Sequence, residues 1–168
     1  MPLTLILIRH AKSSWDDPTA DDHARVLNAR GRRAAPAIGG WLAQHGYQPD
    51  LILCSDAART QETARLILPK LELTPNLVLT PNLYHASPDS MLDLIQKQTA
   101  ACVALIGHNP GIGLLAAGMI WRPPNHPRFA DYPTCATTVI RFDTGQWPDV
   151  RPHSGDCIAF TVPDDLTN

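Results

Sequence analysis

The chain has 168 residues, of which 44% are hydrophobic and 18% charged, with a formal net charge of −2 at pH 7. This length suits one domain with a sizeable core and is too short for two, so we expect a single domain over residues 1–168. A chain without a basic excess is not expected to bind nucleic acid broadly.

Membrane insertion and secretion are not expected either. No run of apolar residues approaches the ~18 that a membrane-spanning helix needs. The first residues lack the pattern of a signal peptide, which predicts a cytoplasmic protein. The four cysteines are widely spaced and form no CxxC pair, so neither disulfides nor a metal site is expected. Cys54 and Cys102 lie in apolar runs and are predicted to be buried thiols.

Short apolar runs alternate with segments of helical spacing along the chain. Strands are expected at 3–8, 51–54, 77–79, 101–106, 137–142 and 157–162, with helices at about 29–45, 57–68, 88–95 and 110–121. This alternation predicts an α/β protein, a three-layer α/β/α sandwich with a mostly parallel central sheet. Strand 101–106 is the most apolar and is expected to be central. The last two strands have no helix between them and are expected to be antiparallel neighbours.

Several residues mark the expected helix ends. Asn28 is a plausible N-cap of the first helix, and Gly46 fits its C-terminal end. Asn109 and Pro110 predict an N-cap followed by proline at the first helical position.

Two segments leave alternatives open. Segment 122–133 holds four of the sixteen prolines and is not expected to be regular, so it is either a surface connection or a rim of the substrate entrance. The tail after Pro163 is expected to be frayed.

An early cluster of arginines is either a solvated helix face or a surface for an acidic partner; its members are Arg25, Arg30, Arg32 and Arg33.

Cationic and nucleophilic residues follow three of the predicted strands. Arg9 and His10 end the first strand, Arg59 opens the helix after the second, and His108 follows strand 101–106. Ligands bind outside the carboxyl ends of parallel strands, so these groups would converge with two helix N-termini around one anion. An imidazole can attack a phosphoryl group while arginines hold its oxygens. Taken singly, these residues also fit purely structural roles. Arg59 fits an exposed arginine on a helix, and His108 fits a residue at the entry to a helix.

These motifs resemble those of the histidine phosphatase superfamily, the phosphoglycerate mutase-like group. Residues 9–11, Arg-His-Ala, are similar to its Arg-His-Gly signature. Segments 55–64 and 107–111 match its second and third motifs. The compact size, segment 25–31 and the ending 155–166 resemble the phosphohistidine phosphatase SixA branch. The resemblance covers nearly the whole chain and implies a phosphoglycerate mutase-like fold.

The resemblance also implies roles for individual residues. His10 is expected to be the nucleophile that is transiently phosphorylated. Arg9 and Arg59 are expected to bind the phosphoryl oxygens, and His108 to donate a hydrogen bond as charge develops. No metal or cofactor is implied, because these groups supply the positive field. Further candidates for substrate contacts are Ser13 and Arg25.

The chain departs from the family pattern at two places. Ala11 stands where the signature has glycine, which requires a backbone conformation open to alanine. Segment 81–86 offers no carboxylate where mutases and many phosphomonoesterases place a proton donor. Asp16 and Asp89 could stand in, but neither matches the motif.

The missing acid favours one class of substrate. An alkoxide leaving group is very basic and depends on a proton donor, whereas a phosphohistidine releases an imidazole whose conjugate acid has a pKa near 6.5. The sequence therefore predicts a phosphatase for phosphohistidine in a protein. The alternatives are a phosphatase for a small phosphomonoester and a non-catalytic phosphoprotein-binding module. A mutase is not expected, since it would also need a larger lid.

Overall fold

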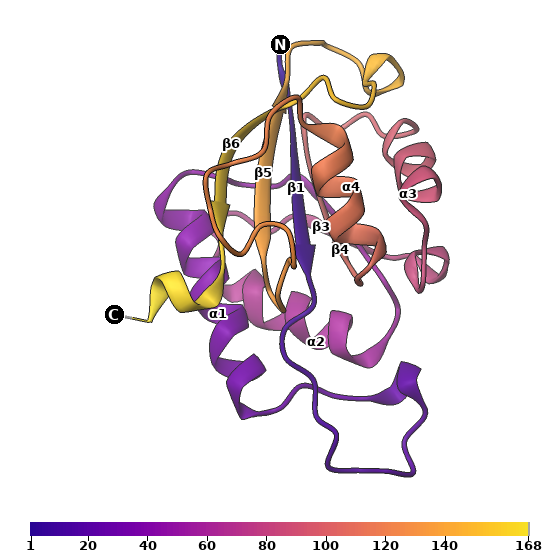
Figure 1. Ribbon diagram of the computed structural model, residues 1–168, viewed down its shortest axis with the longest axis vertical. Coiled ribbons are helices and arrows are strands. Elements are labelled where there is room, and N and C mark those ends of the chain that lie inside the picture. The colour runs from indigo at the N-terminus through magenta and orange to yellow at the C-terminus, as the bar shows by residue number, and fades with distance from the viewer. Residues whose placement is uncertain (168) are drawn as a thin grey trace.

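Six strands form one sheet in the order β3-β2-β4-β1-β5-β6 in the computed structural model, which describes residues 1–167 (Figure 1). All neighbouring strands are parallel except at β5, which is antiparallel to both β1 and β6. The sheet is therefore mostly parallel, with the last two strands antiparallel to each other, as predicted. The strands are β1 Leu3–Arg9, β2 Leu51–Cys54, β3 Asn76–Leu79, β4 Cys102–Gly107, β5 Thr137–Phe142 and β6 Asp156–Thr161.

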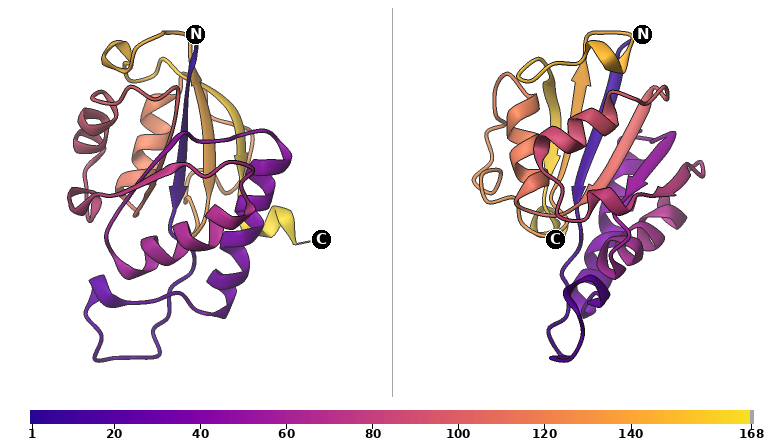
Figure 2. Two further views of the ribbon diagram at one scale, coloured as in Figure 1. Left: turned by 180° about the vertical axis from the view of Figure 1, so that it is seen from behind. Right: turned by 90° about the vertical axis from the view of Figure 1, so that its right-hand side faces the viewer.

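Two pairs of helices cover opposite faces of the sheet (Figures 1 and 2). Helices α1 (Ala29–Gln44) and α2 (Ala58–Ile67) lie on one face, and α3 (Pro88–Ile95) and α4 (Gly111–Met119) on the other. Alternate side chains of a strand point to opposite faces. Accordingly, Ile6 and Ile8 of β1 pack in the cluster that contains residues of α1 and α2, whereas Leu5 and Leu7 pack with α3 and α4. The three-layer architecture is confirmed.

The ends of α1 follow the prediction. The side chain of Asn28 accepts a hydrogen bond from the backbone N–H of Gly31 at 2.9 Å, which makes it the N-cap. Gly46, just beyond the helix, has a φ of 73°, a left-handed conformation that favours glycine at this position.

The start of α4 was predicted one residue too early. Pro110 is the N-cap and Gly111 the first helical residue. Asn109 lies before the helix, where its Oδ1 accepts from Gly113 N at 3.2 Å and its Nδ2 donates to the carbonyl of Tyr132 at 2.9 Å. The asparagine thus caps a helix N–H while also holding a distant loop.

Two further predictions were wrong. The tail is ordered through residue 167: residues Pro163–Leu166 form a short 3₁₀ helix, and Asp165 accepts from the N–H of Val162 at 3.1 Å and contacts His126 at 2.9 Å. Cys102 is only half-buried, although Cys54 is fully buried. Segment 122–133 contains no helix or strand, as predicted. None of the helices in the described part of the chain is long and apolar enough to cross a bilayer.

Candidate active site

The carboxyl ends of β1, β2 and β4 lie side by side and open onto one pocket. Arg9 at the end of β1 is in register with Gly107 at the end of β4, and Cys54 is in register with Ile106. The pocket has a volume of about 380 Å³. All six residues predicted for the site line it: Arg9, His10, Ser13, Arg25, Arg59 and His108.

Hydrogen bonds hold both the backbone and the imidazole ring of His10 in place. His10 N donates to the carbonyl of Gly107 at 3.0 Å, and its own carbonyl accepts from Cys135 N at 2.9 Å. Its ring Nδ1 lies 2.7 Å from the carbonyl oxygen of Ala11. Because a carbonyl can only accept, Nδ1 carries the proton and Nε2 has the free electron pair.

The same histidine is held in its neutral form. Burial and the charges of the surrounding arginines lower the pKa of His10 to about 3, against the hydrogen bond to Ala11, which raises it. Ala11 is fully buried and is not among the residues with positive φ, so alanine fits here without strain. Its N–H donates to Thr63 Oγ1 at 3.0 Å.

The second pocket histidine is held by a buried serine. His108 Nε2 lies 2.7 Å from Ser55 Oγ, and the ring centroid lies 5.3 Å from that of His10. Burial, followed by the proximity of His10 and Arg59, lowers the pKa of His108 to about 3. Its imidazole is therefore neutral at pH 7.

Two buried side-chain nitrogens of the pocket have no hydrogen-bond partner in the described part of the chain. Within residues 1–167, the buried side-chain nitrogens without a hydrogen bond are Arg9 Nε and His108 Nδ1. A buried donor left unsatisfied costs about 1–3 kcal/mol, so this site is built to receive an acceptor. Anionic oxygens beside a guanidinium would satisfy both groups.

Segment 122–133 helps to position the first arginine. Arg9 donates through Nη1 to the carbonyl of Tyr132 at 3.0 Å, and Asn109 donates to the same oxygen at 2.9 Å. Tyr132 is anchored in turn, because its hydroxyl hydrogen-bonds to the carbonyl of Leu7 at 3.0 Å inside the core. The proline-rich segment is thus tied to the site at its C-terminal end.

The loop between β1 and α1 contributes the two weaker candidates. Arg25 hydrogen-bonds to Ser13 Oγ and pairs with Asp22 Oδ1 at 2.9 Å. Its guanidinium also lies 3.4 Å from the ring centroid of Trp15, whose side chain is exposed. Ser13 is buried and forms a bridge with Leu27, which closes this loop on itself.

Sequence reasoning missed the carboxylate of the pocket, Asp22. Its Oδ2 lies 3.1 Å from Arg59 Nη2, and its backbone carbonyl accepts from Arg59 Nη1 at 2.6 Å. A hydrogen bond from Tyr84 and the charge of Arg59 lower the pKa of Asp22 to about 2, so the group is ionised at neutral pH. Neither Asp16 nor Asp89 lines the pocket. No sequence motif marks Asp22, which reaches the site only through the path of its loop.

His85 was also missed, although it lies in the segment searched for a carboxylate. It lines the pocket, with Nε2 3.9 Å from Asp22 Oδ2 and its ring centroid 6.3 Å from that of His108. Its φ of 58° is left-handed, a conformation that is uncommon for residues other than glycine. No group of three or more histidine, cysteine, aspartate or glutamate side chains within residues 1–167 is arranged to hold a metal ion.

Comparison with known proteins gives the class to which this fold and site belong. Residues 5–84 match the histidine phosphatase superfamily (branch 1). A protein of Mycobacterium tuberculosis named only as uncharacterized, Rv1276c, is 31% identical over 163 residues, covering 93% of this chain and 99% of its own. The chain belongs to the histidine phosphatase superfamily and is a phosphatase.

Solved structures narrow the assignment within the superfamily. A candidate phosphohistidine phosphatase SixA from Agrobacterium tumefaciens has 29% identity and a TM-score of 0.80, covering 97% of this chain and 99% of its own. Another, from Nakamurella multipartitia, has 25% identity and a TM-score of 0.81, covering 97% of each chain. The chain is a member of the SixA branch of the superfamily.

Proposed function

We propose that this phosphatase removes the phosphoryl group from phosphohistidine in a protein, through a phosphorylated His10, as a single catalytic domain over residues 1–168. The ionisation of Asp22 is the observation that favours phosphohistidine as the substrate. The carboxylate of the pocket is held ionised by Tyr84 and Arg59 and so has no proton to give to a leaving group.

His10 has the properties of the nucleophile. Its Nδ1 proton is committed to Ala11, so the Nε2 electron pair is available, and its lowered pKa keeps that pair free at neutral pH. Attack of Nε2 on phosphorus forms one P–N bond as the substrate's P–N bond breaks. The bonding electrons stay on the leaving imidazole, which departs as a neutral ring because its other nitrogen is protonated.

The remaining groups stabilise the transferring phosphoryl group. Arg9 and Arg59 would bind its oxygens, and Arg25 and Ser13 also line the pocket. Ser55 Oγ accepts from Ala57 N at 3.3 Å and can donate its hydroxyl proton to His108 Nε2. In that arrangement the ring proton of His108 is on Nδ1, which would donate to a phosphoryl oxygen. Water then attacks phosphorus: a P–O bond forms as the P–N bond to His10 breaks, and the electron pair returns to Nε2. The proton of the attacking water leaves with the phosphate or to solvent, so His10 is again a neutral imidazole.

Two relatives support the same substrate class. The structures from Agrobacterium tumefaciens and Nakamurella multipartitia are both named as candidate phosphohistidine phosphatases, and both match this chain over nearly its whole length. The partner would therefore be a histidine-phosphorylated protein rather than a nucleic acid or a membrane. The compartment that we propose is the cytoplasm.

Rapid-quench trapping with a ³²P-labelled phosphohistidine peptide tests the mechanism. We expect an acid-labile, alkali-stable label on His10 that is lost in His10→Ala and kept in the exposed control His45→Ala. Full turnover by His10→Ala would disprove the covalent step. In parallel, kcat/KM for phosphohistidine should exceed that for glycerol phosphate by orders of magnitude; the reverse preference would assign the site to small phosphomonoesters.

A further inference from the structure

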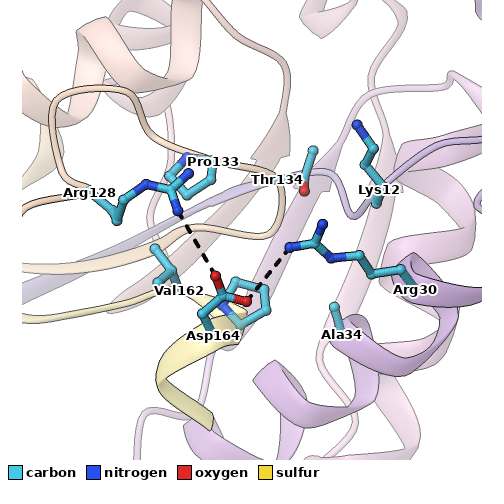
Figure 3. A pocket seen from close by; sticks show the side chains of 9 residues that line it. Lys12, Arg30, Ala34, Arg128, Pro133, Thr134, Val162 and Asp164 are labelled. Carbon is cyan, nitrogen blue, oxygen red and sulfur yellow. Dashed lines mark ion pairs between the residues drawn. The ribbon is translucent and has the colours of Figure 1, made fainter. Parts of the chain in front are cut away.

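A second, smaller cleft lies next to the catalytic pocket. Figure 3 shows the residues that line it. Lys12 and Thr134 line both cavities, so the two are adjacent. The cleft has a volume of about 30 Å³, room for one small polar group rather than a second large ligand. Its charged side chains come from separate parts of the chain and are Lys12, Arg30, Arg128 and Asp164.

The cleft has more positive than negative charge along its walls, and its one carboxylate is loosely held. Asp164 lies 3.6 Å from Arg30 and 4.0 Å from Arg128, beyond hydrogen-bond distance in both cases (Figure 3). The side chains of Asp164 and Arg30 are 63% and 64% exposed, and exposed pairs of this kind contribute little. Arg128 is also held by Asp131 at 3.0 Å, whereas Lys12 has no ion pair within residues 1–167.

Lys12 and Arg30 lie on segments whose positions are linked to the catalytic pocket. Lys12 follows His10 by two residues, and its carbonyl accepts from Asn28 N at 3.0 Å, just before α1. Helix α1 approaches Lys12 so closely that a Cβ on Gly31 would lie 2.2 Å from the Lys12 carbonyl oxygen. The position of Arg30, next to this contact, is thereby tied to the position of the nucleophile.

We propose that this cleft binds a carboxylate side chain of the phosphorylated protein, in exchange for Asp164, while the phosphoryl group occupies the catalytic pocket. The proposal rests on the proposed function and adds an acidic residue near the phosphohistidine as a determinant of specificity. Guanidinium groups match carboxylates in geometry and charge. Asp164 itself shows that the space between Arg30 and Arg128 accepts a carboxylate, and its long contacts leave it free to exchange.

The test uses two synthetic phosphohistidine peptides that differ only in having glutamates or glutamines around the phosphohistidine, together with free phosphohistidine. We expect the wild type to show a KM lower by about fivefold for the glutamate peptide, as weak exposed ion pairs would give. This preference should fade as salt is raised. The double variant Arg30→Gln/Arg128→Gln should lose it, and Asp164→Asn should increase it by removing the internal competitor.

Controls separate the possible failures. Arg141→Gln, an exposed arginine at the opposite end of the sheet, should keep the preference, and free phosphohistidine should be cleaved alike by all variants. Equal KM values for the two peptides, or a preference that survives in the double variant, would overturn the proposal. If no phosphohistidine substrate is cleaved while glycerol phosphate is, the proposed function fails instead.

Discussion

Ser55 Oγ lies 2.7 Å from His108 Nε2, and both side chains are buried at the ends of neighbouring parallel strands. The contact joins two motifs that are far apart in the sequence. The other ring nitrogen, Nδ1, has no hydrogen-bond partner among residues 1–167. Ser55 is thus a positioning residue for His108 rather than a simple helix cap.

Ser55→Ala is expected to lower kcat about tenfold with little change in KM. The loss corresponds to about 1.4 kcal/mol, the contribution of one buried hydrogen bond to holding the ring and its tautomer. Nitrogen-15 NMR of the His108 ring should show mixed tautomers in the variant and a single one in the wild type. The control is Ser154→Ala, which removes an exposed hydroxyl just before β6, at the edge of the sheet away from the pocket. It should leave both readouts unchanged. A rise in KM at unchanged kcat would contradict this role.

The two pocket histidines predict how stability depends on pH. Each has a pKa of about 3 in the folded state, against an ordinary value of 6.5. Between these values the unfolded chain binds more protons than the folded one. The free energy of unfolding should therefore be fully retained above pH ~6.5 and fall as the pH drops toward ~3.

Urea denaturation at pH 7 and pH 5 measures this loss. The double variant His10→Gln/His108→Gln should lose less stability between the two pH values than the wild type, because its pocket carries no imidazole to protonate. His45→Gln, an exposed histidine, should lose as much as the wild type. Equal losses in the double variant and the wild type would show that the pocket imidazoles are not held neutral by the fold.

The features that could be predicted from the sequence are those set by local chemistry. Short apolar runs such as 3–8 and 101–106 favour strands of a buried sheet, and parallel strands end at one edge. That rule alone brings His10, Arg59 and His108 together before any contact is known. The cap at Asn28 is likewise local, because its partner Gly31 is three residues away.

The features that could not be predicted depend on the paths of loops. Asp22 reaches Arg59 across 37 residues of sequence, and no spacing rule encodes that approach. The C-terminal segment is held in place by the contact of Asp165 with His126, which lies 39 residues earlier in the sequence. Asn109 was misplaced for the same reason, since its amide serves the distant carbonyl of Tyr132 as well as the helix.

A pair of glycines in α1 tests the close approach of this helix to the loop that carries Lys12. A Cβ on Gly31 would lie 2.2 Å from the Lys12 carbonyl oxygen, whereas one on Gly40 would meet nothing within 4 Å. Gly31→Ala should therefore destabilise the protein by about 1–3 kcal/mol, because backbone must shift. Gly40→Ala should stabilise it by about 0.5–1 kcal/mol through helix propensity. Urea denaturation measures both, and similar effects of the two changes would contradict the packing described.

Asp22 occupies the arginines that would bind the phosphoryl group, so its removal should strengthen phosphate binding. If Asp22 were instead a proton donor, its removal would lower the activity on alkyl phosphates. Asp22→Asn removes a negative charge 3.1 Å from Arg59 and 2.9 Å from Arg25, so inorganic phosphate should inhibit the variant at a several-fold lower concentration. Because the wild-type carboxylate is already ionised, activity on glycerol phosphate should not fall relative to activity on phosphohistidine.

Asp56→Asn is the matched control for this change, since Asp56 pairs with His23 nearby but does not line the pocket. It should leave both the inhibition by phosphate and the ratio of the two activities unchanged. A selective loss of activity on glycerol phosphate in Asp22→Asn would identify Asp22 as a proton donor. In that case the carboxylate must gain a proton when substrate binds, and the inference from leaving-group basicity to phosphohistidine would no longer hold.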